Sequence, residues 1–224
     1  MASAMDDTPV ADMTLDEMRP RLVAAMLPHV PFDGWGWQSL DLAARELGVP
    51  PEAARLAFPG GDIDMIDAWT MQADRDMEAA LANPPARIRD RFRAAILTRL
   101  EQAAPDREAV RKASVVLALP TNARRAAAIA WRSADSIWRA IGDTSTNFSF
   151  YSRRAIAMGV YTATILVWLD DDSEDFAETR AFLDRRIDGV MRFEKMKARW
   201  RGPSDGEYFS PARFLGRLRY PVRD

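Results

Sequence analysis

Residues 155–169 form a continuous stretch without a charged side chain, bounded by two arginines and by three aspartates at 170–172. A membrane-spanning helix needs about 20 predominantly apolar residues, and this run is shorter and interrupted by Thr162 and Thr164. A helix that is hydrophobic on every side is expected to be surrounded by protein. The stretch therefore predicts the central helix of a helical bundle.

Most of the remaining chain also has the apolar periodicity of helices, with Pro and Gly at the boundaries. The expected helices cover 15–27, 38–47, 51–58, 62–81, 86–103, 107–119, 120–141, the uncharged run and a last long helix after 173. No β-type alternation or internal repeat appears. The predicted fold class is all-α, with about nine helices. We expect four parts along the chain: a disordered N-terminus at 1–13, a helix-turn-helix-containing part at 14–82, a helical bundle at 83–200, and a linker with an amphipathic helix at 201–224.

Charge is distributed unevenly along the chain. The formal net charge is −2, yet residues 180–224 carry +6 and the rest therefore −8. An acidic body with a basic tail argues against general affinity for nucleic acid and permits attraction to anionic lipid. There are no cysteines, and the first residues resemble neither a signal peptide nor a transit peptide. A bacterial cytosol is the expected compartment.

A helix-turn-helix outline spans residues 37–58, with Gly48 at the turn. A plain pair of packed helices fits the same pattern and stays open. The second helix, in "PPEAARLAF", offers Arg55 but no Lys, Asn, Gln, Ser or Thr for base edges. Three aspartates follow it closely. This chemistry argues against DNA binding.

The C-terminal stretch "GEYFSPARFLGRLRYPVRD" has the composition of a short interfacial helix. Apolar side chains fall on one side, and arginines that suit lipid phosphates flank them. The alternative, that this helix docks on the bundle, stays open. The candidate membrane-binding residues are Phe209, Arg213, Phe214, Leu215, Arg217 and Leu218.

Catalytic chemistry is sparse. The one histidine, His29, lies in a loop, and no phosphate-binding loop or dinucleotide fingerprint occurs. The aspartates at 170–172 precede Ser173 and a new helix, where carboxylates favour the helix N-terminus, so capping is preferred to a metal site. We expect no catalytic residues, no cofactor and no metal.

Small residues recur every four positions along one side of the uncharged helix, at Ala155, Gly159 and Ala163. Such a stripe permits close helix packing or leaves space for an apolar ligand, and both readings stay open. The chain also has seven tryptophans. The candidate lipid-binding residues are Trp131, Ala134, Trp138, Ala155, Gly159, Ala163 and Leu166.

Three stretches, "GWGWQSLDLAARELGV", "FPGGDIDMIDAW" and above all the block at 142–191, resemble the accessory lipid-binding protein family of ubiquinone (coenzyme Q) biosynthesis. The resemblance covers about residues 15–200. It implies a fold similar to tetracycline-repressor-type regulators, with a helix-turn-helix that no longer regulates transcription. It also implies binding of isoprenoid lipids, membrane association through a C-terminal amphipathic helix, and support of the pathway's di-iron hydroxylase.

The family's partner-binding patch centres on an Asp-Phe-Asn-Trp-Tyr-x-x-Arg stretch. Tyr151 and Arg154 match it directly, Phe150 keeps the aromatic bulk without the indole N–H, and Asn147 keeps the size without the charge. Ile137 comes from the preceding helix. Aromatic and arginine side chains exposed together are typical of binding hot spots. From the residues alone, an inward Phe150 with merely solvated arginines remains the alternative.

The function expected from the residues and the resemblance together is non-enzymatic. The chain would bind isoprenoid quinone intermediates and present them to the hydroxylase, as a homodimer peripheral on the inner membrane of a bacterium. The alternative is a ligand-responsive DNA-binding regulator of the tetracycline-repressor type. A third hypothesis, a small enzyme acting on an apolar substrate, would require turnover that depends on a specific carboxylate.

Overall fold

The computed structural model describes residues 9–81, 85, 87–142 and 148–201, with only the backbone for 148–150 and 193–201. It forms two compact units, Met1–Ile187 and Asp188–Asp224. The described elements are helices, with no strand among them, so the predicted all-α fold is confirmed. The predicted part 14–82 lies within the first unit, and the predicted bundle at 83–200 extends beyond its boundary at Ile187.

The N-terminal helices are α1 (Leu15–Met26), α2 (Val30–Asp33), α3 (Trp37–Glu46) and α4 (Pro51–Leu56), preceded by the 3₁₀ turn η1 (Val10–Asp12). Thr14 begins α1 with a reciprocal capping box to Glu17, which satisfies two free backbone N–H groups. Gly48 has a φ of +68° between α3 and α4, a conformation that glycine adopts without steric cost. The helix-turn-helix outline is therefore present.

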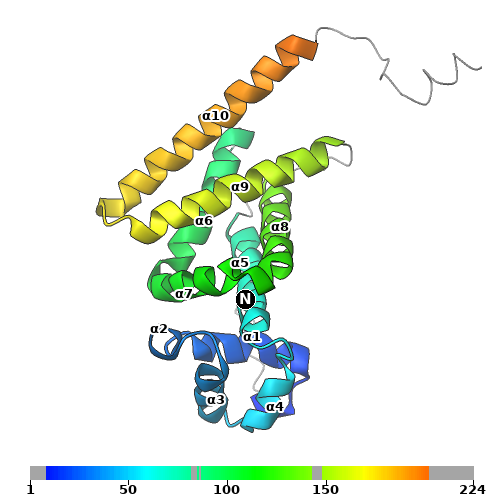
Figure 1. Cartoon of the computed structure of the whole chain (residues 1–224), viewed down its shortest axis with the longest axis vertical. Helices are drawn as coiled ribbons and strands as arrows, with labels where there is room; N and C mark the ends of the chain where they lie inside the picture. Colours follow the sequence, from blue (N-terminus) through cyan, green and yellow to red (C-terminus); the bar gives the residue numbers. More distant parts are fainter. Residues whose placement is uncertain (1–8, 82–84, 86, 143–147, 202–224) are drawn as a thin grey trace, which may run out of the picture. The chain divides into compact units, whose positions relative to one another are not determined.

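The larger helices follow: α5 (Asp62–Ala80), α6 (Ile88–Ala103), α7 (Arg107–Ala118), α8 (Ala123–Ala140), α9 (Phe148–Asp170) and α10 (Ala177–Arg201). Short 3₁₀ turns η2 (Ala104–Asp106), η3 (Pro120–Asn122) and η4 (Glu174–Phe176) lie between them. Helix α5 packs on α1 and on α8, and α8 packs on α9 (Figure 1). Helix α5 thus belongs both to the N-terminal core and to the bundle.

Helix α9 contains the uncharged run. Its inward face carries Ala157, Val160, Thr164 and Trp168, which are all buried. Ala155 and Gly159 are exposed, and Leu166 is 56% exposed. The expectation that protein surrounds this helix is therefore wrong on one side, as far as the described residues show. None of the described helices combines the length and the apolarity that crossing a bilayer requires.

Of the three aspartates at 170–172, Asp171 caps the start of the following helix, which is the kind of role that the sequence predicts. The carboxylate of Asp171 accepts hydrogen bonds from the backbone N–H of Thr179 at 2.8 Å and of Ser173 at 2.9 Å. Arg107, from α7, donates to the carbonyl oxygens of Trp168 and Asp171 and so satisfies the end of α9. Among the described residues no group of acidic or histidine side chains could hold a metal ion.

Candidate functional site: an apolar cavity in the helical bundle

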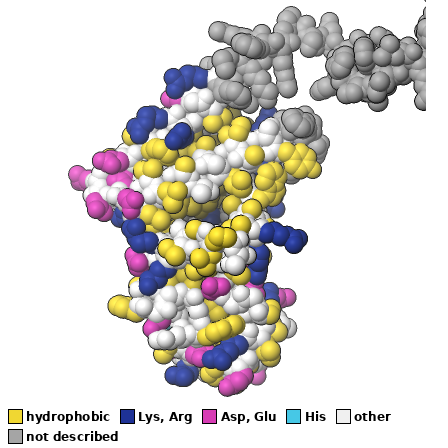
Figure 2. All heavy atoms as spheres, viewed as in Figure 1, with side chains coloured by type: hydrophobic (Ala, Val, Ile, Leu, Met, Phe, Trp, Pro, Cys, Tyr) yellow, Lys and Arg dark blue, Asp and Glu magenta, His cyan; other side chains and the backbone are white. Residues whose placement is uncertain are grey.

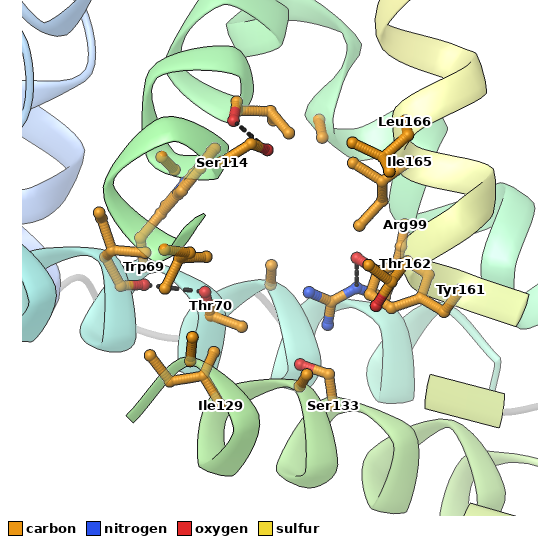
Figure 3. A pocket seen from close by; sticks show the side chains of 18 of the residues that line it. Trp69, Thr70, Arg99, Ser114, Ile129, Ser133, Tyr161, Thr162, Ile165 and Leu166 are labelled. Atoms are coloured by element: carbon orange, nitrogen blue, oxygen red, sulfur yellow. Dashed lines mark hydrogen bonds between the residues drawn. The ribbon is translucent and has the colours of Figure 1, made fainter. Parts of the chain in front are cut away.

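A cavity of about 390 Å³ lies between α5, α7, α8 and α9, with α6 contributing two residues. Small-molecule sites range over about 300–1,000 Å³, so the volume suits a small ligand or part of a larger one. Figure 3 shows side chains from these helices directed toward the open space. Its large apolar lining residues are Ile66, Trp69, Val110, Leu117, Ile129, Ile165, Leu166 and Trp168.

Alanines account for much of the remaining lining, because small side chains leave the volume empty. They come from α5, α6, α7 and α8: Ala73, Ala103, Ala113, Ala118, Ala126 and Ala130. Leu166 both lines the cavity and is 56% exposed, so it marks a mouth at the surface. Hydrophobic side chains gather on the face of the molecule formed by α7 and α9 (Figure 2).

Two of the hydroxyl groups in the lining are satisfied by their own helices. Thr70 donates to the carbonyl of Ile66 at 2.8 Å, and Ser114 donates to the carbonyl of Val110 at 2.9 Å (Figure 3). To bind a polar group of a ligand, these two hydroxyl groups would have to give up the hydrogen bonds to their own helices. This part of the wall is therefore effectively apolar.

The charged lining residue is Arg99 on α6. Its side chain is buried and forms an ion pair with Asp74 on α5, which is also buried. The Nε–H of Arg99 donates to the hydroxyl oxygen of Tyr161 at 2.7 Å, and the guanidinium carbon lies 5.1 Å from the centre of the tyrosine ring. Ser133 donates to the second oxygen of Asp74 at 3.3 Å. Helices α5 and α9 therefore contact this guanidinium directly, and α8 contacts its partner Asp74.

Burial and nearby cations shift the pKa of the Asp74 carboxyl in opposite directions. Burial raises the pKa of Asp74 above its ordinary value of 3.8, and the nearby Arg99 and Arg132 oppose this effect without cancelling it. Arg132 lies 3.7 Å from Asp74 and 2.5 Å from Asp67. The pair Arg99–Asp74 is thus close to neutral overall. Apart from this paired guanidinium, no charged side chain is among the described lining residues.

A second hollow of about 240 Å³ lies between α1, α5, α6 and η2. It shares Trp69, Ala73, Arg99 and Ala103 with the cavity. These four side chains therefore form a common wall between the two spaces.

Of the predicted lipid-binding residues, Leu166 lines the cavity. Trp131, Ala134, Trp138, Ala155, Gly159 and Ala163 do not. Ala134 is fully buried in the core, and the indole of Trp138 donates to the carbonyl of Arg153 at 3.0 Å. A Cβ placed on Gly159 would meet no atom within 4 Å, so among the described residues nothing packs closely on the small-residue stripe. The cavity faces the next side of α9, at Tyr161, Ile165 and Trp168.

The predicted partner-binding residues divide into exposed and buried ones. Tyr151 is 62% exposed and stacks on Trp131, with ring centres 6.2 Å apart. Ile137 is fully buried, and Arg154 is buried against Asp135 on α8 at 2.5 Å. The expectation that Ile137 and Arg154 lie on an exposed patch is therefore wrong for this chain, because both are core residues of the α8–α9 contact.

Two groups of predicted residues cannot be placed. Asn147 and the side chain of Phe150 lie outside the described residues, as do all six candidate membrane-binding residues between Phe209 and Leu218. Their roles stay predictions.

Sequence reasoning missed Arg99, Asp74 and Tyr161, although a signal for the first two exists. Arg99 lies three residues after buried Ile96 and four residues before Ala103, so the helical period places it on the inward side of α6. Asp74 stands in core register with buried Met77 on α5. A charge of each sign at an inward position of two neighbouring helices predicts a buried pair, because an unpaired buried charge is too costly.

Comparison with known proteins finds sequences similar to this chain. Residues 123–194, which cover α8, α9 and the first part of α10, match the family model COQ9. "Ubiquinone biosynthesis protein COQ9, mitochondrial" from Rattus norvegicus is 31% identical over 186 residues. The protein of the same name from Homo sapiens is 30% identical over 185 residues.

The chain is similar in sequence to these COQ9 proteins over most of its own length. Each of these two alignments covers 79% of the chain but only 59% and 58% of the COQ9 relatives' own length. Within the chain, the COQ9 family match contains the helices that carry Ile129, Tyr161 and Leu166 of the cavity.

A solved structure shows the same fold. The TetR transcriptional regulator from Nitrosomonas europaea ATCC 19718 superposes with a TM-score of 0.61 and 21% identity, covering 76% of this chain and 96% of the regulator. The tetracycline-repressor-like architecture implied by the sequence resemblance is thereby confirmed.

Proposed function

We propose that this COQ9 homologue is a non-enzymatic lipid-binding accessory protein of ubiquinone biosynthesis. It binds isoprenoid quinone intermediates at a membrane surface and presents them to the pathway's di-iron hydroxylase. The proposal draws on the names of the relatives and on one structural observation, the apolar cavity of about 390 Å³ with a mouth at Leu166.

The cavity supplies what removal of a lipid from a bilayer needs. A prenyl tail leaving the acyl region would expose apolar surface to water at a cost of about 25 cal/mol per Å². Isoleucine, leucine, tryptophan and alanine side chains in the lining replace that environment. The cavity is modest in volume, so it holds one end of a long isoprenoid while the remainder passes the mouth.

Three surfaces of the protein have proposed roles, in hydroxylase binding, membrane binding and dimerisation. The aromatic pair Tyr151–Trp131 contributes to the hydroxylase contact, since exposed tyrosine and tryptophan are typical hot-spot residues. The basic amphipathic stretch at 206–224 brings the protein to anionic lipid on the inner membrane of a bacterium. Two copies pair through their last helices, as repressor-like bundles commonly do.

The fold also suggests a second function, a ligand-responsive DNA-binding regulator. Helix α4, in the position of a recognition helix, has only six residues, and its Arg55 is paired with Asp41 at 2.5 Å. That arginine would have to leave its partner to reach a phosphate or a base. Salt-dependent binding to duplex DNA at low micromolar protein would favour the regulator.

The test of the first function is native mass spectrometry of the purified protein, with extraction of any bound lipid and titration of prenylated quinones. A bound or acquired prenylated quinone is the expected result. Ala130→Trp should abolish uptake because Ala130 lines the cavity, whereas Ala127→Trp, on an exposed position of the same helix, should not. A protein that carries no lipid and takes up no quinone would contradict the function.

A further inference from the structure

The polar atoms around the cavity differ in how fully they are used. An arginine has five N–H donors, and a tyrosine hydroxyl both donates and accepts. Arg99 uses Nε–H on Tyr161 and Nη1 on Asp74. Among the described residues, neither Nη2 of Arg99 nor the hydroxyl proton of Tyr161 has an acceptor. Two donors with no protein acceptor therefore lie side by side at the wall.

Both donors belong to residues that line the cavity. Arg99 is 6% exposed, and Figure 3 shows its guanidinium beside the tyrosine hydroxyl at the edge of the open space. The other hydroxyls in the buried wall already donate to Ile66, Val110 or Asp74. Both donors are accessible from the cavity and have no protein acceptor among the described residues, so a ligand oxygen can accept hydrogen bonds from them.

We propose that Arg99 and Tyr161 together bind the oxygen-bearing end of the ligand, and that the ligand is an apolar molecule with a neutral oxygen acceptor, such as a quinone carbonyl, at that end. This inference rests on the proposed lipid-binding function and adds the determinant of ligand choice and orientation. The oxygen end lies inward at Arg99, and the apolar tail runs toward the mouth at Leu166.

The charge balance decides between a neutral oxygen and a carboxylate. Asp74 already neutralises the guanidinium, and Arg132 is committed to Asp67 as well as to Asp74. A fatty-acid carboxylate placed here would be buried without a cation of its own, which is strongly unfavourable. A carbonyl or ether oxygen accepts the same hydrogen bonds without that penalty.

The orientation follows from burial. Arg99 is nearly inaccessible, whereas Leu166 is 56% exposed. Beyond Arg99, the cavity ends at the wall shared with the second hollow. The exposed lining residues Ala118, Thr162 and Leu166 lie on α7 and α9, so a tail runs outward past these two helices.

The experiment compares three probes whose tails differ by at most one carbon: decylubiquinone, decylbenzene and decanoic acid. Binding of each to the full chain is measured by titration calorimetry. The wild type should bind decylubiquinone at least about tenfold more tightly than either of the others, since hydrogen bonds to a charged group are the strong class.

The decisive variant is the pair Asp74→Asn with Arg99→Gln, which removes both charges together and avoids an orphaned carboxylate. It should bring decylubiquinone affinity down to that of decylbenzene and leave decylbenzene unchanged. Tyr161→Phe, which removes only a hydroxyl, should lower decylubiquinone affinity several-fold and decides the question if the double variant does not fold. The matched control is Arg93→Gln with Asp184→Asn. Arg93 lies on the same helix α6 and pairs with Asp184 of α10 at 2.7 Å, and neither residue lines the cavity, so this variant should change nothing.

The outcomes separate the two proposals. If the wild type binds neither decylubiquinone nor decylbenzene, the lipid-binding function itself fails. If it binds both and the Arg99 and Tyr161 variants leave their ratio unchanged, the function stands and this inference is overturned. Tighter binding of decanoic acid than of decylubiquinone would also overturn it.

Discussion

Asp171 lies in a run of three aspartates but has a structural task that its two neighbours lack. Although burial pushes the pKa of Asp171 upward, hydrogen bonds from the side chains and backbone of Ser173 and Thr179 outweigh it and hold the pKa well below the ordinary value of 3.8. Asp172 has a fully solvated side chain with one distant contact, 3.6 Å from Arg107. The contacts of Asp171 join the end of α9 to the start of α10.

The depressed pKa of Asp171 has a defined consequence for stability. The ionised form is favoured in the folded state, so its contribution is complete above about pH 4, the ordinary range of an aspartate, and is lost as pH falls toward the folded-state pKa. Asp171→Ala should lower the free energy of unfolding by about 1–3 kcal/mol at neutral pH and flatten the loss of stability below about pH 4. Urea denaturation at several pH values measures both effects.

Asp172→Ala serves as the control and should stay within about 0.5 kcal/mol of the wild type. Equal effects of the two substitutions would mean that the cap hydrogen bonds of Asp171 do not stabilise the fold.

Arg154 and Tyr151 are neighbours in sequence that should respond in opposite ways. Arg154→Glu places a second acid against Asp135 in the α8–α9 contact, and should destabilise the protein by about 3 kcal/mol or more. Tyr151→Ala removes an exposed ring and should cost about 1 kcal/mol or less while weakening association with the hydroxylase. Thermal unfolding and a hydroxylase pull-down give the two readouts. A stable Arg154→Glu protein would place this side chain on the surface after all.

The burial of Arg154 could not be predicted from sequence because its partner Asp135 lies on another helix. Nothing local in "FYSRRAIA" distinguishes Arg154 from Arg153, whose guanidinium lies 5.9 Å from the Trp138 ring. Pairing across helices depends on the angle between them. The same limit hid the Arg99–Tyr161 contact, which joins α6 to α9.

At the scale of elements, periodicity and Pro/Gly punctuation were sufficient for most helix boundaries. The prediction missed α2, which has four residues and begins beside Pro31, too short for a periodic pattern. It also chose the wrong side of α9 as the cavity face. The two threonines of the uncharged run do not mark its outward side, because Thr162 is exposed and Thr164 is buried, and the stripe Ala155–Gly159–Ala163 gave no information about direction.

The C-terminal stretch at 206–224 is predicted to bind anionic membranes. Removal of residues 206–224 should reduce sedimentation with vesicles containing anionic phosphatidylglycerol, because apolar and arginine side chains are lost together. Vesicles of neutral phosphatidylcholine are the comparison, and raised salt should weaken only the anionic case. Unchanged sedimentation would assign this stretch to another task.

At the scale of the molecule, the all-α class followed from the periodicity of the sequence, and the repressor-like architecture followed from the family resemblance.

 The TetR regulator, at 21% identity, confirms the repressor-like fold. The cavity was not predictable in position, because its lining comes from five helices and its volume depends on how alanines such as Ala126 and Ala130 face one another. Only the register of charged residues on α5 and α6 indicated where its polar end lies.

The wall formed by Trp69, Ala73, Arg99 and Ala103 is also a fixed stop. Moving Arg99 aside would separate a buried ion pair, so the two hollows do not merge at a modest energetic cost. The depth available to a bound molecule is therefore constant, and additional length must project outward past Leu166. A pocket of fixed depth binds the same first segment of a short or a long prenyl chain. The rest of a long chain then contacts apolar surface outside the pocket.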